Sequence, residues 1–91
     1  MSSTPGVVVD LVYLARLREE FGRAGERLEL PRSVRTVGEL RTLLAARGPV
    51  WSGELAPGRA VRIAVNHSLA EGSVPLAAGD EVAFFPPVTG G

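Results

Sequence analysis

The chain of 91 residues contains no cysteine and no lysine. Without cysteine it has no disulfide framework, no thiolate zinc site and no cysteine nucleophile. All ten basic residues are arginine, so no lysine amine of this chain could attack an activated acyl group at Gly91, and only the N-terminus could compete. Aromatic residues make up only 5% of the sequence, against 45% hydrophobic residues in total. The core is therefore expected to be aliphatic.

Excess charge of one sign and long apolar runs are also missing. The formal net charge is zero, which argues against a nucleic-acid or membrane-surface role. No apolar run approaches the roughly 18 residues of a membrane-spanning helix. The first residues have neither the basic nor the apolar region of a secretory signal. We therefore expect a cytoplasmic protein with no nucleic-acid or membrane partner.

The length and the turn-forming residues predict one domain between two irregular ends. Residues 1–6 are small and polar and include proline and glycine, which is typical of a disordered lead-in. Residues 7–85 are expected to form the folded domain, and residues 86–91 a flexible Gly-Gly tail.

The clearest predicted helix begins at Thr36. Thr36 and Glu39 have the spacing of a capping box, in which each side chain accepts a hydrogen bond from the other residue's backbone. Gly48-Pro49 is expected to end the helix. Its apolar stripe consists of Val37, Leu40, Leu43 and Leu44.

The rest of the domain is predicted to be mainly extended. A short helical turn is expected over residues 15–21 and an irregular segment over 50–58, where Trp51 would cover one end of the core. Turns are expected at Asn66-His67 and at residues 78–80. β-Branched and alternating patterns predict the main strands, at residues 7–13, 27–30, 60–65 and 81–85. This order predicts an α+β domain, a mixed sheet packed on one main helix.

One face of the predicted sheet is apolar yet has no helix to cover it. Asp10 is the only polar residue in the first strand, so its side of the strand is expected to be the less buried one. A contiguous apolar patch left on a sheet indicates a protein partner. The predicted members of this patch are Val8, Val12, Leu14, Ala64, Leu69 and Phe85.

The familiar catalytic constellations are absent from the sequence. His67 is the only histidine, and its place after Asn66 is typical of a surface turn. Asp80 and Glu81 are adjacent, so on a strand their side chains diverge, and Asp80 is better explained by the turn after Gly79. No phosphate-binding loop is present. We expect a chain that is not an enzyme by itself, with no metal site and no bound cofactor.

The end of the sequence is its most distinctive feature: Pro86-Pro87-Val88-Thr89-Gly90-Gly91. Each proline fixes its φ angle and lacks an N–H group, so the segment resists joining a strand and runs out extended. The two glycines have no Cβ and can pass close to the walls of a narrow channel. Six residues reach roughly 20 Å beyond the fold. The pattern predicts a terminal carboxylate presented for chemistry.

Two segments of the sequence resemble the MoaD family, the small subunits of molybdopterin synthase. They are Ala64-Val65-Asn66-His67-Ser68-Leu69 and the thirteen residues from Gly79 to Gly91, and the likeness covers residues 7–91. The resemblance implies a ubiquitin-like β-grasp fold. It also implies a sulfur carrier in molybdenum cofactor biosynthesis, whose sulfur is donated to a cyclic pterin precursor.

The same resemblance implies partners and site residues. An E1-like enzyme of the MoeB type would use ATP to adenylate the Gly91 carboxyl, which a sulfur donor would convert to a thiocarboxylate. The tail residues Gly90, Thr89, Val88, Pro87 and Pro86 would carry Gly91 into the large, MoaE-type subunit of a heterotetramer, where the catalytic groups would lie. The partner-binding anchors would be Phe85, Leu69 and Leu14.

Other roles remain open at this stage. A related sulfur carrier for thiamine, cysteine or tRNA thiolation would differ only in its acceptor. A ubiquitin-like protein modifier would join Gly91 to lysines of target proteins. A β-grasp interaction module with an inert tail is the third alternative.

Overall fold

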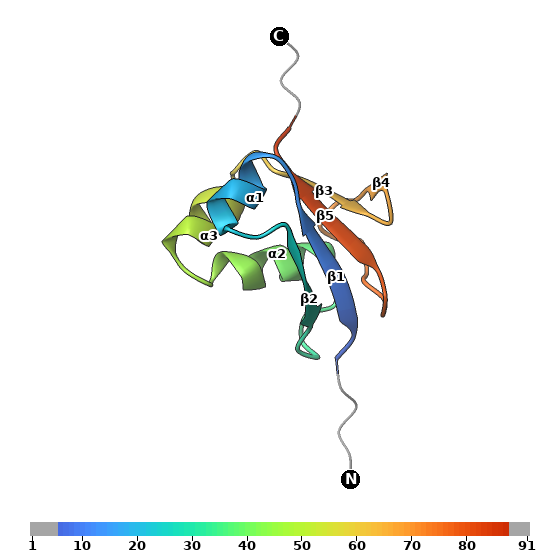
Figure 1. The fold of residues 1–91 in the computed structure, drawn as a ribbon. Helices are drawn as coiled ribbons and strands as arrows, with labels where there is room; N and C mark the ends of the chain where they lie inside the picture. The colour runs from blue at the N-terminus through green and yellow to red at the C-terminus, as the bar shows by residue number, and fades with distance from the viewer. Residues whose placement is uncertain (1–5, 88–91) are drawn as a thin grey trace.

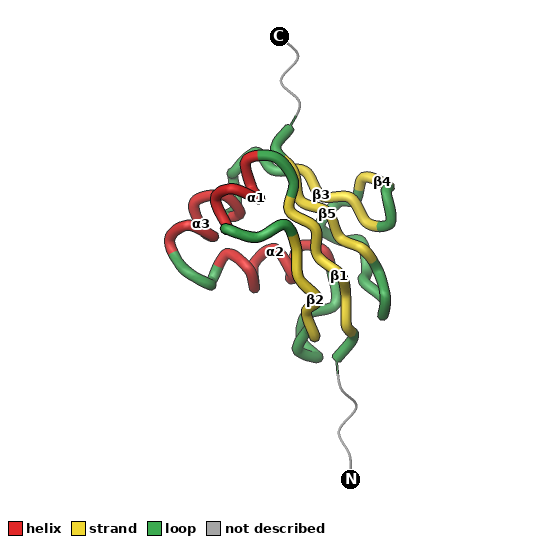
Figure 2. The backbone as a smooth tube through the Cα atoms, viewed as in Figure 1, coloured by secondary structure: helices red, strands yellow, loops and turns green. Residues whose placement is uncertain are grey.

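The computed structural model describes residues 6–87, which form a five-stranded sheet with three helices against one of its faces (Figure 1, Figure 2). Residues 1–5 and 88–91 lie outside the described part. In chain order the elements are β1 (Val8–Tyr13), α1 (Arg16–Phe21), β2 (Gly25–Glu29), α2 (Val37–Ala45), α3 (Pro49–Leu55), β3 (Arg62–Val65), β4 (Ser68–Leu69) and β5 (Glu81–Phe85).

The first and last strands lie side by side in the middle of the sheet. The strand order is β2-β1-β5-β3-β4, and β1 pairs with β5 in parallel. The other pairs, β1 with β2, β3 with β5 and β3 with β4, are antiparallel. The mixed sheet and the α+β class predicted from the sequence are therefore confirmed, with α2 the longest of the three helices.

The helix-facing side of the sheet is the core side, as the alternation around Asp10 predicts. In β1 the side chains of Val9, Leu11 and Tyr13 are buried, whereas Asp10 is half-buried. In β5 the same alternation buries Val82 and Phe84. The remaining core residues are Leu17, Phe21, Leu30, Val37, Leu40, Leu44, Leu55 and Ile63.

Helix α2 begins at the predicted cap. The Glu39 backbone N–H donates to Thr36 Oγ1 at 3.2 Å, and the Thr36 backbone N–H donates to Glu39 Oε1 at 3.1 Å. Two donors that the first helical turn would otherwise leave without partners are thus satisfied. The Arg35 backbone N–H also donates to Glu39, and this bond chiefly holds the pKa of the Glu39 carboxyl below its usual value.

The prediction of an irregular segment over residues 50–58 is wrong for residues 50–55, because Pro49–Leu55 is helix α3. Pro49 occupies its first turn, where the missing N–H costs nothing and the fixed φ angle favours the helix. Ser52 and Gly53 are poor helix formers, so the local pattern is weak. The helix is stabilised by packing instead, since Leu55 is fully buried and Trp51 stacks on Phe21 with ring centroids 3.9 Å apart. The predicted covering role of Trp51 is confirmed.

Strand β2 is shifted toward the N-terminus from the predicted residues 27–30. Its first residue, Gly25, lies opposite Val12 in the register with β1. A Cβ at Gly25 would lie 2.3 Å from the Leu11 carbonyl oxygen, so only glycine allows the two backbones to approach this closely. Long-range pairing thus extends the strand beyond its hydrophobic residues.

Ala15 has a strained backbone at the junction of β1 and α1, with φ 53° and ψ −128°. This region strongly favours glycine, and other residues there cost on the order of 1–3 kcal/mol. We therefore expect Ala15→Gly to stabilise the domain by about 1 kcal/mol and to raise Tm by about 4–8 °C.

Thermal unfolding followed by circular dichroism measures this effect. Ala45→Gly is the matched control, because Ala45 lies in α2, where glycine lowers stability. If both variants lowered Tm, the Ala15 backbone would not be strained.

Candidate functional site

The tail leaves the domain from the end of the central strand β5. Phe85 is the last residue of β5, and Pro86 and Pro87, here called the tail root, are half-buried. Figure 1 shows this end of β5 at the opposite end of the sheet from the start of β1. Val88, Thr89, Gly90 and Gly91 lie outside the described residues, so the predicted chemistry of Gly91 stays a prediction.

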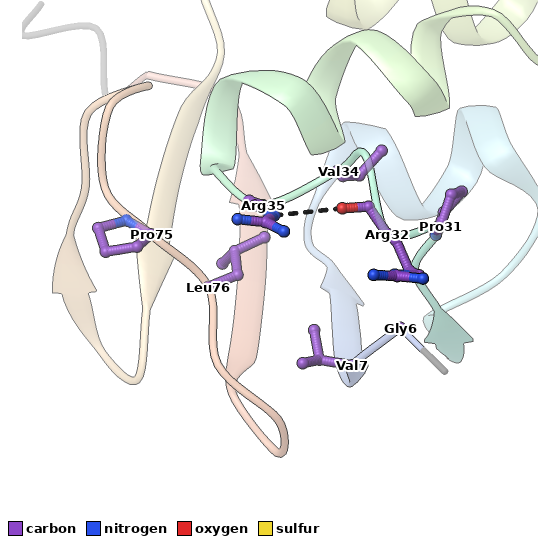
Figure 3. A pocket seen from close by; sticks show the side chains of 8 residues that line it. All are labelled: Gly6, Val7, Pro31, Arg32, Val34, Arg35, Pro75 and Leu76. Atoms are coloured by element: carbon purple, nitrogen blue, oxygen red, sulfur yellow. Dashed lines mark hydrogen bonds between the residues drawn. The ribbon is translucent and has the colours of Figure 1, made fainter. Parts of the chain in front are cut away.

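A cavity of about 400 Å³ lies at the far end of the molecule from the tail root. Its walls include Gly6, Pro31 and Leu76 (Figure 3). Its charged residues are Arg32 and Arg35. Nε of Arg35 donates a hydrogen bond to the backbone carbonyl oxygen of Arg32 at 3.3 Å. The wall has no carboxylate, histidine or hydroxyl group, so this cavity offers no acid–base or nucleophilic chemistry.

A smaller cavity, of about 290 Å³, lies directly beside the tail root. Pro86 and Pro87 form one wall, and the others come from the start of α1, the end of α3 and the loop before β3. Its charged residues are Arg16, Glu54 and Arg59. Sequence analysis did not identify these three residues, because nothing local connects positions so far apart in the chain.

The face of the sheet opposite the helices, here called the open face, has its side chains in four rows, and in the row farthest from the tail Val8 pairs with Glu29. The row nearest the tail contains Leu14, Phe85 and Arg62, since Arg62 pairs with Phe85 and the Leu14 N–H donates to the Phe84 carbonyl oxygen. In the third row from the tail Asp10 pairs with Glu81 and with Arg27. The middle row crosses four strands and is apolar, formed by Val12, Ala83, Ala64 and Leu69.

The three predicted partner-binding anchors all lie toward this open face. Leu69 is 69% exposed and Leu14 is 44% exposed. Phe85 is half-buried, beside the small side chains of the middle row. The structure thus brings together three residues that lie far apart in the sequence. Their binding of a partner remains a prediction.

Tyr13 and Glu26 are titratable groups with shifted pKa values on the core side of the sheet. Burial raises the pKa of Tyr13, and so does its hydrogen bond to Glu26 Oε2 at 2.7 Å. Burial alone would raise the pKa of Glu26, but hydrogen bonds from Arg47 (2.7 and 3.1 Å) and from Tyr13 hold it below its usual value. Near neutral pH Tyr13 is therefore protonated and Glu26 ionised, a pair that stabilises the fold rather than transferring protons.

The remaining polar side chains of the sheet belong to turns. Asn66 and His67 have φ angles of 50° and 74°, which fit the predicted turn between β3 and β4. Asp80 accepts from Asn66 Nδ2 at 2.9 Å and from the Ala77 backbone N–H at 2.8 Å, so it ties two turns together. Across residues 6–87, no three side chains that could ligate a metal gather in one place. Nor does that part of the chain contain a helix long and apolar enough to cross a membrane.

Comparison with known proteins gives full-length matches. The ThiS family matches residues 11–91. The chain is 39% identical over 84 residues to the molybdopterin synthase sulfur carrier subunit of Escherichia coli (strain K12). The aligned residues make up 92% of this chain and 100% of that protein.

Two solved structures match the whole domain. One is a Pyrococcus furiosus protein assigned as subunit 1 of a molybdopterin converting factor, with 33% identity, a TM-score of 0.77, and coverage of 91% of this chain and 100% of that one. The other is the small archaeal modifier protein 1 of Haloferax volcanii, with 29% identity, a TM-score of 0.72, and the same coverage. The predicted β-grasp fold is thus confirmed.

Proposed function

The chain belongs to the ThiS family, and from that membership we propose that it is a sulfur carrier of molybdenum cofactor biosynthesis, the small subunit of a molybdopterin synthase. The observation that carries the proposal is the 39% identity, over the full length of the relative, to a molybdopterin synthase sulfur carrier subunit. The tail root at the end of a central strand supports it, because the strand holds the base of the tail in a fixed position.

The proposed chemistry takes place at the Gly91 carboxylate. A carboxylate is a poor electrophile, so an E1-like enzyme of the MoeB type first joins it to the α-phosphate of ATP and releases pyrophosphate. Sulfide released from a sulfur donor then attacks the acyl carbon, the acyl–phosphate bond breaks, and AMP leaves with its electron pair. The product is a thiocarboxylate, whose deprotonated sulfur is the nucleophile. Because the chain has no cysteine, Gly91 is the position at which it can carry the sulfur.

The large synthase subunit is the proposed partner of the carrier in its thiocarboxylate form. The tail enters its active site, and the terminal sulfur attacks the cyclic pterin precursor to form a thioester. Water then hydrolyses the acyl–sulfur bond, which leaves the sulfur on the pterin and regenerates the Gly91 carboxylate. The dithiolene of molybdopterin contains two sulfur atoms, so two carriers in the thiocarboxylate form are consumed for each product. The extended prolines of the tail root reduce the entropy lost when the tail is bound.

Protein modification is the second candidate function, and the similarity to a small archaeal modifier favours it. In that role the activated Gly91 carbonyl would form an amide with a lysine amine of a target protein. Because this chain has no lysine, a second copy could not be added to a side chain of the first. Copies of the chain could therefore be linked to one another only through the N-terminal amine.

Intact-mass spectrometry tests the proposal. After incubation with ATP, the E1-like enzyme and a sulfur donor, the chain is expected to gain about 16 Da, because one carboxylate oxygen is replaced by sulfur. Omission of ATP is the control and should leave the mass unchanged. A mass that stays constant in the complete reaction, with a ladder of lysine conjugates on an immunoblot of cell extract, would instead support the modifier.

A further inference from the structure

Topology brings three arginines to the base of the tail. Arg16 is the first residue of α1, Arg59 lies in the loop after α3, and Arg62 is the first residue of β3. Arg16 and Arg59 line the cavity beside the tail root on the helix side of the sheet. Arg62 is exposed on the open face, where it pairs across strands with Phe85. The tail root thus has guanidinium groups on both sides.

The arginines on the helix side are held in place. Nε and one terminal nitrogen of Arg16 donate to Glu54 Oε2, at 3.3 and 3.0 Å. Arg59 Nε donates to the Gly53 carbonyl oxygen. Arg41 in turn fixes the loop that carries Arg59, since its guanidinium donates to the carbonyl oxygens of Leu55 (2.6 Å), Ala56 (2.9 Å) and Arg59 (2.9 Å).

The positive charge at the tail root is only partly compensated. Glu54 is the one carboxylate in the cavity, and its side chain is 16% exposed, whereas that of Arg16 is 66% exposed. Within residues 6–87 Arg62 has no ion pair and no side-chain hydrogen bond. In the cavity Arg16 and Arg59 are therefore opposed by one carboxylate, while Arg62 lines a separate pocket with Glu71. The side chain of Arg16 and the residue Arg62 remain exposed.

The rows of the open face that lie farther from the tail contain Asp10, Glu81 and Glu29. Asp10 and Glu81 are neighbours in the register of β1 and β5, and Asp80 precedes Glu81. Arg27 and the exposed His67 are their basic partners, at 3.1 and 3.3 Å. On the open face these carboxylates lie away from the tail root, whereas Arg62 lies beside it. Arg32 and Arg35 form a second basic site, in the cavity at the far end of the molecule.

We propose that Arg16, Arg59 and Arg62 form a basic collar, which docks against carboxylates at the mouth of the channel through which the large synthase subunit admits the tail. The inference rests on the proposed function. The four residues from Val88 to Gly91 extend about 13 Å at most. A partner that takes in the whole tail therefore brings the mouth of its channel close to the collar. Acidic side chains there would complement the collar and orient the carrier before the tail enters.

Association kinetics test this proposal. The probe is the large synthase subunit of the same organism. The carrier is the full-length chain with a carboxylate, and no sulfur, at Gly91. At about 50 mM salt, Arg59→Glu with Arg62→Glu is expected to lower kon at least tenfold and to change koff by less than threefold. At about 500 mM salt the difference in kon should shrink to about twofold, because exposed charges are then screened.

The matched control is Arg32→Glu with Arg35→Glu, which changes the net charge equally at the opposite end of the molecule. It is expected to keep kon within about twofold of the wild-type value. An equal loss of kon in both double variants would overturn the collar, as would an unchanged kon in the first. Arg62→Glu alone guards against misfolding, because the exposed Arg62 side chain has no hydrogen bond or ion pair within residues 6–87. This single variant should lower kon about threefold.

The outcomes separate the two proposals. Suppose that the wild-type chain binds the large subunit and gains sulfur, and that the collar variant has the same kon. This result would overturn the proposed role of the collar but not the proposed function. A wild-type chain that does not bind the large subunit would overturn both the collar and the proposed function.

Discussion

Deletion of Gly91 is expected to abolish sulfur transfer while the domain stays folded. The shortened chain ends in a carboxylate on Gly90, which lies about 3.3 Å closer to the tail root. Acyl transfer requires reacting atoms at a separation of about 3–3.5 Å. A displacement of one residue therefore places the terminal carbonyl outside the active sites of the E1-like enzyme and of the large synthase subunit. We expect the conversion of pterin precursor to fall at least 100-fold, to roughly the background without the carrier.

The measurement is the conversion of precursor by the purified large subunit, with the E1-like enzyme, ATP and a sulfur donor present. Deletion of Ser2 and Ser3 is the matched control, because it shortens the other end of the chain and should keep full activity. The Tm of both variants should equal that of the wild type, since neither deletion removes a described contact. Normal conversion without Gly91 would show that the sulfur is not carried on that residue.

Local signals in the sequence were sufficient for the elements that depend on neighbouring residues. The capping box of Thr36 and Glu39 involves residues three positions apart, and the structure has both of its hydrogen bonds. The alternation in β1 depends on the pleat of a single strand, and it gave the buried and open faces correctly. These features need no knowledge of the rest of the fold.

Features that depend on long-range contacts were not predictable. Helix α3 has a weak local pattern, and packing of Leu55 and of Trp51 on Phe21 stabilises it. Strand β2 begins at Gly25 because β1 lies opposite. Glu26 is a charged residue in a strand, and only its contacts with Tyr13 and Arg47 explain why it is half-buried.

In the candidate site, too, the sequence predicts the part that depends on consecutive residues and misses the part that depends on long-range contacts. The tail and its glycines can be seen in the sequence, because the chemistry of a terminal carboxylate depends on consecutive residues. The basic collar cannot, because Arg16 and Arg59 are separated by more than half of the domain. They meet at the tail root because the first strand and the last lie side by side at the centre of the sheet.

Phe85→Ala is expected to weaken binding to the large subunit about 30-fold, which corresponds to about 2 kcal/mol. Phe85 lies on the open face at the last position of β5, directly before the tail root. In the register Phe85 lies between Leu14 of β1 and Arg62 of β3. A large aromatic side chain at the point where the tail leaves, next to an exposed Leu14, is suited to anchor a partner.

The stability of the domain should change little in this variant. Phe85 is only half-buried and lies on the face away from the helices, so its loss should cost about 1 kcal/mol or less. Phe84 is the contrasting neighbour, because it is fully buried and its ring centroid lies 5.9 Å from that of Tyr13. Phe84→Ala is expected to cost about 3–5 kcal/mol. Urea unfolding of the two variants measures this difference.

Val50→Ala is the binding control for Phe85→Ala. Val50 is 48% exposed on α3, on the helix side of the sheet, so its truncation removes apolar surface outside the open face. Calorimetric titration with the large subunit should give the wild-type Kd for Val50→Ala and a Kd about 30-fold higher for Phe85→Ala. A Phe85→Ala variant that unfolds as readily as Phe84→Ala would place Phe85 in the core. Equal binding by Phe85→Ala and Val50→Ala would mean that the partner does not use the open face.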